Sequence, residues 1–211
     1  MRLNNNEFED RTSSYWLASV PRTDYPSLQE DVKTDVAIVG GGMAGITTAF
    51  LLKMKGFKVT VVEADRILHG TTGHTTAKLT SQHALIYARI KNQMGEELAQ
   101  QYADANEKAI DMVASLVKEY GIDCDFSWQP AHMYTNSHKF IKDLEDEYQA
   151  AAGFGIKASL EDKLNMPFPL KLALKYEGQA QFHPLKYLQV LAEKIPGGGS
   201  AVYENTPAVN I

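Results

Sequence analysis

Gly40, Gly42 and Gly45 form a G-x-G-x-x-G pattern, which is typical of backbone turns that bind phosphate groups. The first glycine permits a tight turn, the second lets the backbone approach a pyrophosphate, and the third lets a helix pack closely on a strand. A helix that starts here would offer free N–H groups and a partial positive charge to the phosphates. Glu63 follows about 20 residues later, where a carboxylate can accept hydrogen bonds from both ribose hydroxyls. These residues predict an adenine-dinucleotide site, and the carboxylate disfavours a 2′-phosphorylated ligand.

The segments around the glycines have the patterns that such a site needs. Residues 35–39 are an apolar run, as in a strand that is buried on both faces. A helix is expected over 46–55, with Gly56 placed to end it, and a second buried strand over 58–63. This order predicts a βαβ unit of Rossmann type. A glycine-rich turn with a purely structural role is the alternative.

A loop rich in hydroxyl groups follows the second strand, over 66–81. The glycine pattern by itself does not separate FAD from NAD. FAD is longer than a βαβ unit can hold, so its middle phosphates and ribityl chain need a second strip of contacts. Thr71, Thr72, Thr75 and Thr76 offer hydroxyl donors for that strip. A solvated polar loop is the alternative.

The rest of the chain alternates between helix and strand patterns. The expected elements are an amphipathic helix over 96–120, a strand over 126–135 with an edge position or bulge at Pro130, a helix capped by Ser137, a strand over 173–182, a helix from Pro184 to Lys194 and a last strand over 201–204. His183 is placed to cap the helix that starts at Pro184. The expected fold is α/β: a parallel nucleotide-binding sheet plus part of an α+β domain with antiparallel strands.

The return to a nucleotide-domain pattern near residue 201 indicates an inserted lobe. Residues 1–34 are interpreted as an N-terminal arm, 35–121 together with 183–211 as the dinucleotide-binding domain, and 122–182 as part of a substrate domain. We expect strands 35–40 and 58–63 to be parallel, with 201–204 joining the same sheet.

Composition excludes several classes of protein. The net charge of −5 gives no basic footprint for nucleic acid. Cys124 is the single cysteine, which excludes a disulfide framework and a thiolate metal site, and no metal site is expected. No apolar stretch approaches the ~20 residues of a membrane span. The polar N-terminus lacks the apolar core of a secretory signal, so a cytoplasmic location is expected.

These stretches resemble the D-amino-acid oxidase-like flavoenzymes, which include glycine and sarcosine oxidases. The resemblance is carried by residues 35–45, by Gly56-x-x-Val59-x-x-x-Glu63-Ala64 and by Gly70-Thr-Thr-Gly73. Three further sequence segments resemble the bacterial branch in which a Rieske iron–sulfur domain follows the flavin domain. They are Ser-Tyr-Trp at 14–16, Thr-Thr-Gly-His-Thr-Thr-Ala-Lys-Leu-Thr-Ser-Gln-His at 71–83 and Gln-Phe-His-Pro at 181–184.

The resemblance implies FAD as cofactor and oxidation of a C–N bond of a small-molecule amine or amino acid, with a hydride equivalent passing to the flavin. The implied FAD contacts are Gly40, Gly42, Met43, Ala44, Gly45, Glu63, Ala64, Thr71, Thr72, Thr75, Thr76 and, through its backbone at the adenine, Val209. Some relatives attach flavin covalently through a histidine near the position of His74. The surrounding residues differ here, and a plain loop histidine is the alternative.

Catalytic residues are not identified by any motif. Lys78 and His83 follow the contact loop and are the candidates for acid–base chemistry, against a surface lysine and a capping or core histidine. Family members continue beyond Ile211, so this chain is expected to be an N-terminal fragment that is inactive by itself. A Rieske cluster would lie in the missing part, and an electron acceptor protein or domain is a possible partner. The alternatives are a catalytically silent nucleotide-binding fragment and an NAD-dependent Rossmann dehydrogenase.

Overall fold

The computed structural model describes residues 14–210, which divide into two compact units. Within the described residues, the first unit holds 14–77, 122–124 and 183–210, and the second holds 78–121 and 125–182. The expected division differs at two points. It groups residues 78–121 with the nucleotide-binding segments, but in the structure they pack with the antiparallel sheet of the second unit. It also assigns 122–124 to the substrate domain, but they belong to the first unit.

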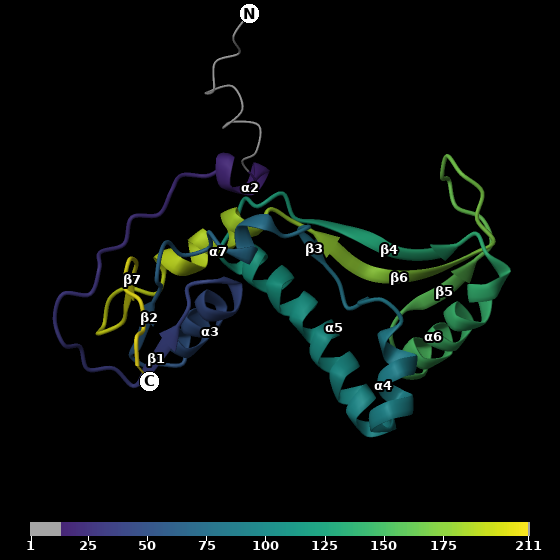
Figure 1. The fold of residues 1–211 in the computed structure, drawn as a ribbon, viewed down its shortest axis with the longest axis horizontal. Coiled ribbons are helices and arrows are strands. Elements are labelled where there is room, and N and C mark those ends of the chain that lie inside the picture. Colours follow the sequence, from purple (N-terminus) through teal and green to yellow (C-terminus); the bar gives the residue numbers. More distant parts are fainter. Residues whose placement is uncertain (1–13, 211) are drawn as a thin grey trace, which may run out of the picture. The chain divides into compact units, whose positions relative to one another are not determined.

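The first unit contains a parallel sheet, with strands in the order β1 (Val36–Val39), β2 (Val59–Val62) and β7 (Ala201–Tyr203) (Figure 1). Val36 is in register with Val59, and Thr60 is in register with Ala201. The helix α3 (Met43–Met54) connects β1 to β2. A crossover of this kind forces its two strands to be parallel. The expected βαβ unit and the expected place of the last strand are therefore confirmed.

Helices α3 and α7 (Pro184–Glu193) pack against each other in this unit. Phe50 of α3 and Leu188 and Leu191 of α7 are buried in its core. The side chain of His183 accepts a hydrogen bond from the Lys186 backbone N–H (3.2 Å), as expected of an N-cap. Among the described residues β1 pairs only with β2, and alternate residues of β1 are exposed.

The second unit contains an antiparallel sheet in which β3 (Lys78–Leu79), β4 (Ser127–Thr135) and β5 (Ala158–Glu161) all pair with β6 (Leu172–Gln181) (Figure 1). The register of β4 against β6 shifts between Gln129 and Ala131. Pro130 lies at this shift because it has no N–H to donate to a ladder. Among the described residues β4 pairs only with β6, so Pro130 lies on an edge strand and at a bulge, the two alternatives that the sequence offered.

Three helices, α4 (Ile86–Met94), α5 (Glu96–Glu119) and α6 (Ile141–Gly153), complete the second unit, with a short 3₁₀ turn η2 (His138–Phe140) before α6. Tyr87 of α4, Ala99 of α5, Leu144 of α6 and Tyr176 of β6 belong to one buried cluster. This shared core explains why residues 78–121 belong to the second unit.

Three elements of this unit, β3, α4 and β5, were not expected from the sequence, and β3 lies where a loop was expected over 66–81. The α4 N-terminus is capped by Glu147 of α6, whose carboxylate accepts from the N–H groups of Tyr87 (3.0 Å) and Ala88 (2.8 Å). A cap supplied by a distant residue leaves no local sequence signal. The strand β5 lies in a Pro-broken stretch and depends on its partner β6. No helix in the described part of the chain is long and apolar enough to cross a membrane.

Candidate dinucleotide-binding site

The glycine turn lies between β1 and α3. Gly40 has φ +103°, which favours glycine, and its N–H donates to the Val62 carbonyl oxygen at 2.8 Å. Gly42 is the N-cap of α3. At Gly45 an added Cβ would lie 1.9 Å from the Gly40 carbonyl oxygen. The helix can therefore pass this close to the turn only with glycine at position 45, which is the packing role expected of the third motif glycine.

Gly41, to which sequence reasoning assigned no role, is also sterically required. A Cβ on it would lie 2.4 Å from the Ile67 Cγ2 atom and 3.2 Å from the Glu63 Cβ atom. Its carbonyl oxygen accepts a hydrogen bond from the Leu68 N–H at 2.9 Å. The only sequence signal was the unbroken run of glycines at 40–42. Gly41 thus lets the segment after Glu63 lie directly against the turn.

Glu63 follows the end of β2 and faces the same turn. Its Oε2 atom accepts from the Gly41 N–H at 2.7 Å, and its Oε1 atom accepts from the Asp65 N–H at 3.1 Å. Each carboxylate oxygen has a second lone pair, so both can accept a further hydrogen bond. The side chain is half-buried. The structure therefore brings the predicted acid to the glycine turn and fixes its orientation with two backbone donors.

The loop after Glu63 returns to the N-terminus of α3. It contains a 3₁₀ turn, η1 (Thr71–His74). The Thr72 side chain is buried, and its hydroxyl oxygen accepts from the Met43 N–H at 3.0 Å. A helix N-terminus has backbone donors without intrahelical partners, and Thr72 meets one of them. The hydroxyl that the sequence predicted for this loop thus lies within hydrogen-bond distance of the motif helix.

The remaining predicted contact residues are mostly accessible. Met43, Ala44, Ala64, Thr71 and Thr76 are exposed, and Thr75 is half-buried. His74 is exposed, and its Nδ1 lies 3.0 Å from the Gly70 carbonyl oxygen, so a proton on Nδ1 is donated there. Val209 is 84% exposed, in a segment after β7 that has no regular secondary structure. Their roles in binding stay predictions.

Lys78 and His83 both belong to the second unit and are exposed. Lys78 lies in β3 opposite Gln181, and His83 lies in the irregular segment before α4. Within the described part of the chain, neither side chain makes a hydrogen bond or ion pair that would indicate a catalytic role. Among the described residues no cluster of His, Cys, Asp and Glu could hold a metal ion.

Glu204 is a buried carboxylate that the sequence analysis missed. It is 1% exposed and follows β7. Its Oε1 atom accepts from the Ile67 N–H at 3.0 Å and from the Thr23 hydroxyl, and its Oε2 atom accepts from the Tyr25 N–H at 3.1 Å. Glu204 therefore ties the N-terminal segment and the segment after Glu63 to the end of the parallel sheet.

Tyr25 is expected to make this unit sensitive to alkaline pH. Burial raises the pKa of Tyr25 to about 12 from an ordinary value of 10, and the carboxylates of Glu193 and Glu204 act in the same direction. A raised pKa means that the folded state favours the neutral phenol. Its stabilising contribution is therefore present below pH 10 and is lost as pH rises toward 12. Denaturant melts at several alkaline pH values should show a smaller loss of stability in Tyr25→Phe than in the unchanged chain. Equal losses would contradict this assignment.

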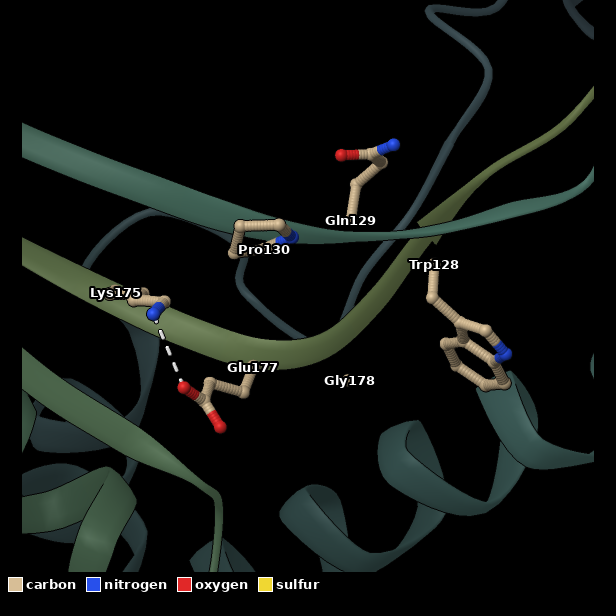
Figure 2. A pocket seen from close by; sticks show the side chains of 6 residues that line it. All are labelled: Trp128, Gln129, Pro130, Lys175, Glu177 and Gly178. Carbon is tan, nitrogen blue, oxygen red and sulfur yellow. Dashed lines mark ion pairs between the residues drawn. The ribbon is translucent and has the colours of Figure 1, made fainter. Parts of the chain in front are cut away.

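The second unit has a shallow hollow of about 220 Å³ beside the bulge in β4, lined by Trp128, Gln129, Pro130, Lys175, Glu177 and Gly178 (Figure 2). The Lys175 Nζ atom lies 3.2 Å from the Glu177 Oε1 atom and 3.5 Å from the Glu161 Oε1 atom. The hydrogen bond to Glu177 raises the pKa of Lys175, with Glu161 adding to it. Lys175 is therefore held in its charged form and is unsuited to act as a base near neutral pH.

A larger hollow of about 580 Å³ lies between α5 and β4, and its wall includes Lys118, Phe126 and Trp128. The Phe126 and Trp128 rings meet edge to face, with centroids 5.1 Å apart. Neither hollow contains a residue that the sequence analysis selected as a site residue. The arrangement that matches the sequence prediction is the glycine turn, Glu63 and Thr72 in the first unit.

Comparisons with known proteins agree with this geometry. Residues 35–211 match the family described as FAD dependent oxidoreductase. The chain is 42% identical over 203 residues to a protein of Bacillus subtilis named "Putative Rieske 2Fe-2S iron-sulfur protein YhfW". The aligned region covers 96% of this chain and 40% of that protein. It is 27% identical over 210 residues to gamma-glutamylputrescine oxidoreductase of Escherichia coli, and this aligned region covers 96% of this chain and 49% of that protein.

Solved structures show the same fold. Glycine oxidase from Geobacillus kaustophilus superposes with a TM-score of 0.64 at 21% identity, covering 83% of this chain and 47% of that one. L-amino acid deaminase from Proteus vulgaris superposes with a TM-score of 0.67 at 17% identity, covering 88% of this chain and 42% of that one. The chain thus spans about half, or less, of the length of the proteins it matches. The match over 35–211, which agrees with the glycine turn and the parallel sheet, shows that the chain belongs to the FAD-dependent oxidoreductase family.

Proposed function

We propose that the first unit binds the adenine-dinucleotide part of FAD at the glycine turn. The observation that carries this proposal is the convergence of three separate segments. The Glu63 carboxylate lies 2.7 Å from the Gly41 N–H, and the Thr72 hydroxyl lies 3.0 Å from the Met43 N–H. The glycine turn, the Glu63 carboxylate and the hydroxyl loop therefore meet at one place. That is the set of groups that a dinucleotide pyrophosphate and its ribose require.

Each group has a role that follows from its chemistry. The N–H groups in the first turn of α3, apart from that of Met43, which donates to Thr72, would hold the pyrophosphate, and the helix dipole would favour its negative charge. The free lone pairs of Glu63 would accept from the ribose hydroxyls. The accessible hydroxyls of Thr71, Thr75 and Thr76 would contact the middle of the cofactor. The other proposed contacts are the motif neighbours Met43, Ala44 and Ala64, the loop residue His74 and, through its backbone, Val209.

The proposed reaction is oxidation of a C–N bond in a small amine or amino acid. Bound FAD supplies the acceptor for the hydride equivalent, and the protein supplies binding and orientation. The proposal is supported by the names of matched proteins, which include an oxidoreductase of gamma-glutamylputrescine, a glycine oxidase and an L-amino acid deaminase. Lys78 and His83 stay the candidates for proton transfer. A relative named as a Rieske protein supports an iron–sulfur domain or protein as the electron acceptor. We place the protein in the cytoplasm.

The domain roles are part of the same proposal. The first unit binds the cofactor, and the second unit, with its antiparallel sheet and exposed aromatic side chains, contributes to a substrate domain. Trp128 and Tyr134 are about half exposed on β4, where they could contact an organic substrate.

The cofactor assignment is tested by titrating the purified chain with FAD and with NAD⁺ while protein and flavin fluorescence are followed. FAD should bind more tightly than NAD⁺. The reaction is tested in the full product of the gene, where anaerobic addition of amines or amino acids should bleach the flavin absorption. Tighter binding of NAD⁺ than of FAD would contradict the first part. Bleaching by 2-hydroxy acids but not by amines would contradict the second.

Glu63→Ala is expected to weaken FAD binding by about 1–3 kcal/mol, because it removes a charged acceptor from the ribose hydroxyls. Glu63 also accepts from Gly41 and Asp65, so the substitution should lower stability as well. The two effects are separated by measuring the FAD dissociation constant well below the melting temperature of the variant. The control is Asp65→Ala, whose exposed side chain has no recorded part in these contacts. An unchanged dissociation constant in Glu63→Ala would rule out the ribose role.

A further inference from the structure

We infer that the segment Ser14–Ser19, here called the arm segment, is a clamp that orders the threonine loop at 70–76 and thereby sets the affinity for FAD. The arm segment contains the short helix α2 (Tyr15–Ala18). The inference rests on the proposed function of the glycine turn and goes beyond it, because none of the proposed FAD contacts falls in the arm segment and the Ser-Tyr-Trp motif at 14–16 has no role assigned so far. Trp16, Leu17 and Ser14 act as positioning residues.

The arm segment contacts the backbone of the loop at Gly73 and at Thr75. The Trp16 Nε1–H donates to the Thr75 carbonyl oxygen at 2.8 Å, and the Ser14 hydroxyl donates to the Gly73 carbonyl oxygen. Leu17 covers Gly73 so closely that a Cβ on this glycine would lie 2.9 Å from the Leu17 Cδ2 atom. Gly73 is buried as a result. Both polar contacts are made to main-chain carbonyls, so they fix the backbone conformation of the loop rather than the position of any one side chain.

The arm segment is itself held on the N-terminus of α7. The Ser19 Oγ atom lies 2.9 Å from the His183 Nε2 atom, and the Trp16 ring meets the His183 ring edge to face at 4.9 Å. His183 Nδ1 accepts from the Lys186 N–H, so the proton of the neutral ring is assigned to Nε2, which donates to Ser19. His183 is 2% exposed. The clamp therefore has a rigid base in the core of the same unit.

The loop connects the arm to the glycine turn. Thr72, which directly precedes Gly73 in the loop, accepts from the Met43 N–H at the start of α3. Loosening the arm leaves the loop with more conformations in the free protein, and binding must then order it. That ordering reduces affinity even though no contact to the ligand is lost. By linkage, FAD must reciprocally stabilise the arm on the loop.

The first test is Trp16→Phe, which keeps an aromatic ring against His183 but removes the donor to Thr75. The FAD dissociation constant should rise by roughly 2- to 12-fold, the scale of one hydrogen bond. Amide hydrogen exchange at 70–76 should become faster in the FAD-free protein and should slow again when FAD is added. The matched control is Tyr148→Phe, which also keeps an aromatic ring and removes a polar hydrogen, but lies on α6 of the other unit, and it should change neither quantity.

The second test asks whether a smaller side chain in the arm compensates for a larger one in the loop. Gly73→Ala should displace Leu17 and raise the FAD dissociation constant. Adding Leu17→Ala should partly restore it, because the methyl group then has space on the arm side. The recovery is partial because the Leu68 carbonyl oxygen, 3.1 Å from the added Cβ, stays in place. The two substitutions are thus expected to be non-additive, as for residues in contact.

The outcomes separate this inference from the proposed function. Unchanged FAD affinity and unchanged exchange at 70–76 in Trp16→Phe would overturn the clamp while leaving the FAD site intact. Additive losses in the Gly73/Leu17 pair would also overturn it. If the unchanged chain binds no FAD, the proposed function and the affinity effect both fail. Exchange at 70–76 in the FAD-free variants would then still decide whether the arm orders the loop.

Discussion

Gly45→Ala is expected to destabilise the first unit and to abolish measurable FAD binding. On helix propensity alone this change should stabilise α3 by about 1 kcal/mol, since glycine is unfavourable in a helix interior. The added Cβ would however lie 1.9 Å from the Gly40 carbonyl oxygen and 3.4 Å from the Ile38 Cγ2 atom. The nearest atom belongs to the backbone of the turn itself, so the conflict cannot be relieved by rotating a side chain. The helix must move away from β1, and overpacking of this kind costs about 1–3 kcal/mol or more.

The matched control for Gly45→Ala is Gly153→Ala, at the last residue of α6. An added Cβ there meets nothing within 4 Å, and the φ angle of this glycine is not in the positive region. The control should be neutral or slightly stabilising in thermal melts, whereas Gly45→Ala should melt at a lower temperature. FAD titration then separates a displaced turn from a globally unfolded chain. A Gly45→Ala protein with unchanged stability and affinity would show that α3 does not pass the turn as closely as the structure indicates.

Glu147→Ala is expected to have the largest effect on the stability of the second unit. Glu147 is fully buried, and its carboxylate accepts from Tyr87 and Ala88 at the start of α4 and from the Tyr176 hydroxyl at 3.4 Å. Removing the carboxylate takes the acceptor from two backbone donors, the buried N–H of Tyr87 and the half-buried N–H of Ala88, and from the buried Tyr176 hydroxyl. Each buried group left unsatisfied costs about 1–3 kcal/mol, and the cavity adds to this. We expect a loss of about 2–5 kcal/mol in the free energy of unfolding.

The control for Glu147→Ala is Glu145→Ala, on the same helix and exposed, which should change stability by less than about 0.5 kcal/mol. Glu147→Gln keeps one acceptor oxygen and should lose less than the alanine variant. Chemical denaturation followed by circular dichroism gives all three values. Equal stability of the Glu145 and Glu147 alanine variants would show that the buried carboxylate does not hold α4 in place.

The local parts of the nucleotide site were predictable because their signals lie close together in the sequence. The spacing of Gly40, Gly42 and Gly45 between an apolar run and a helical run specified the βαβ unit. Its parallel pairing then followed because a crossover helix returns the chain to the end of the sheet at which the first strand began. His183 before Pro184 gave the N-cap, and Pro130 gave the bulge. Each of these features depends on the backbone preferences of a few consecutive residues, and these operate before any tertiary contact forms.

Contacts between distant residues were decided by the tertiary structure alone. Trp16 and Thr75 are 59 positions apart, and Ile67 and Glu204 are 137 apart, so no periodicity or spacing connects them. The helix α4 was missed because its cap comes from Glu147 in another helix. Residues 78–121 were expected to pack with the nucleotide domain, but the buried face of α5 lies in the core of the antiparallel sheet. An amphipathic pattern specifies that a face is buried without specifying its partner. The sequence thus determined which turn can bind a dinucleotide, and the tertiary structure decided which residues hold that turn, its acid and its loop in place.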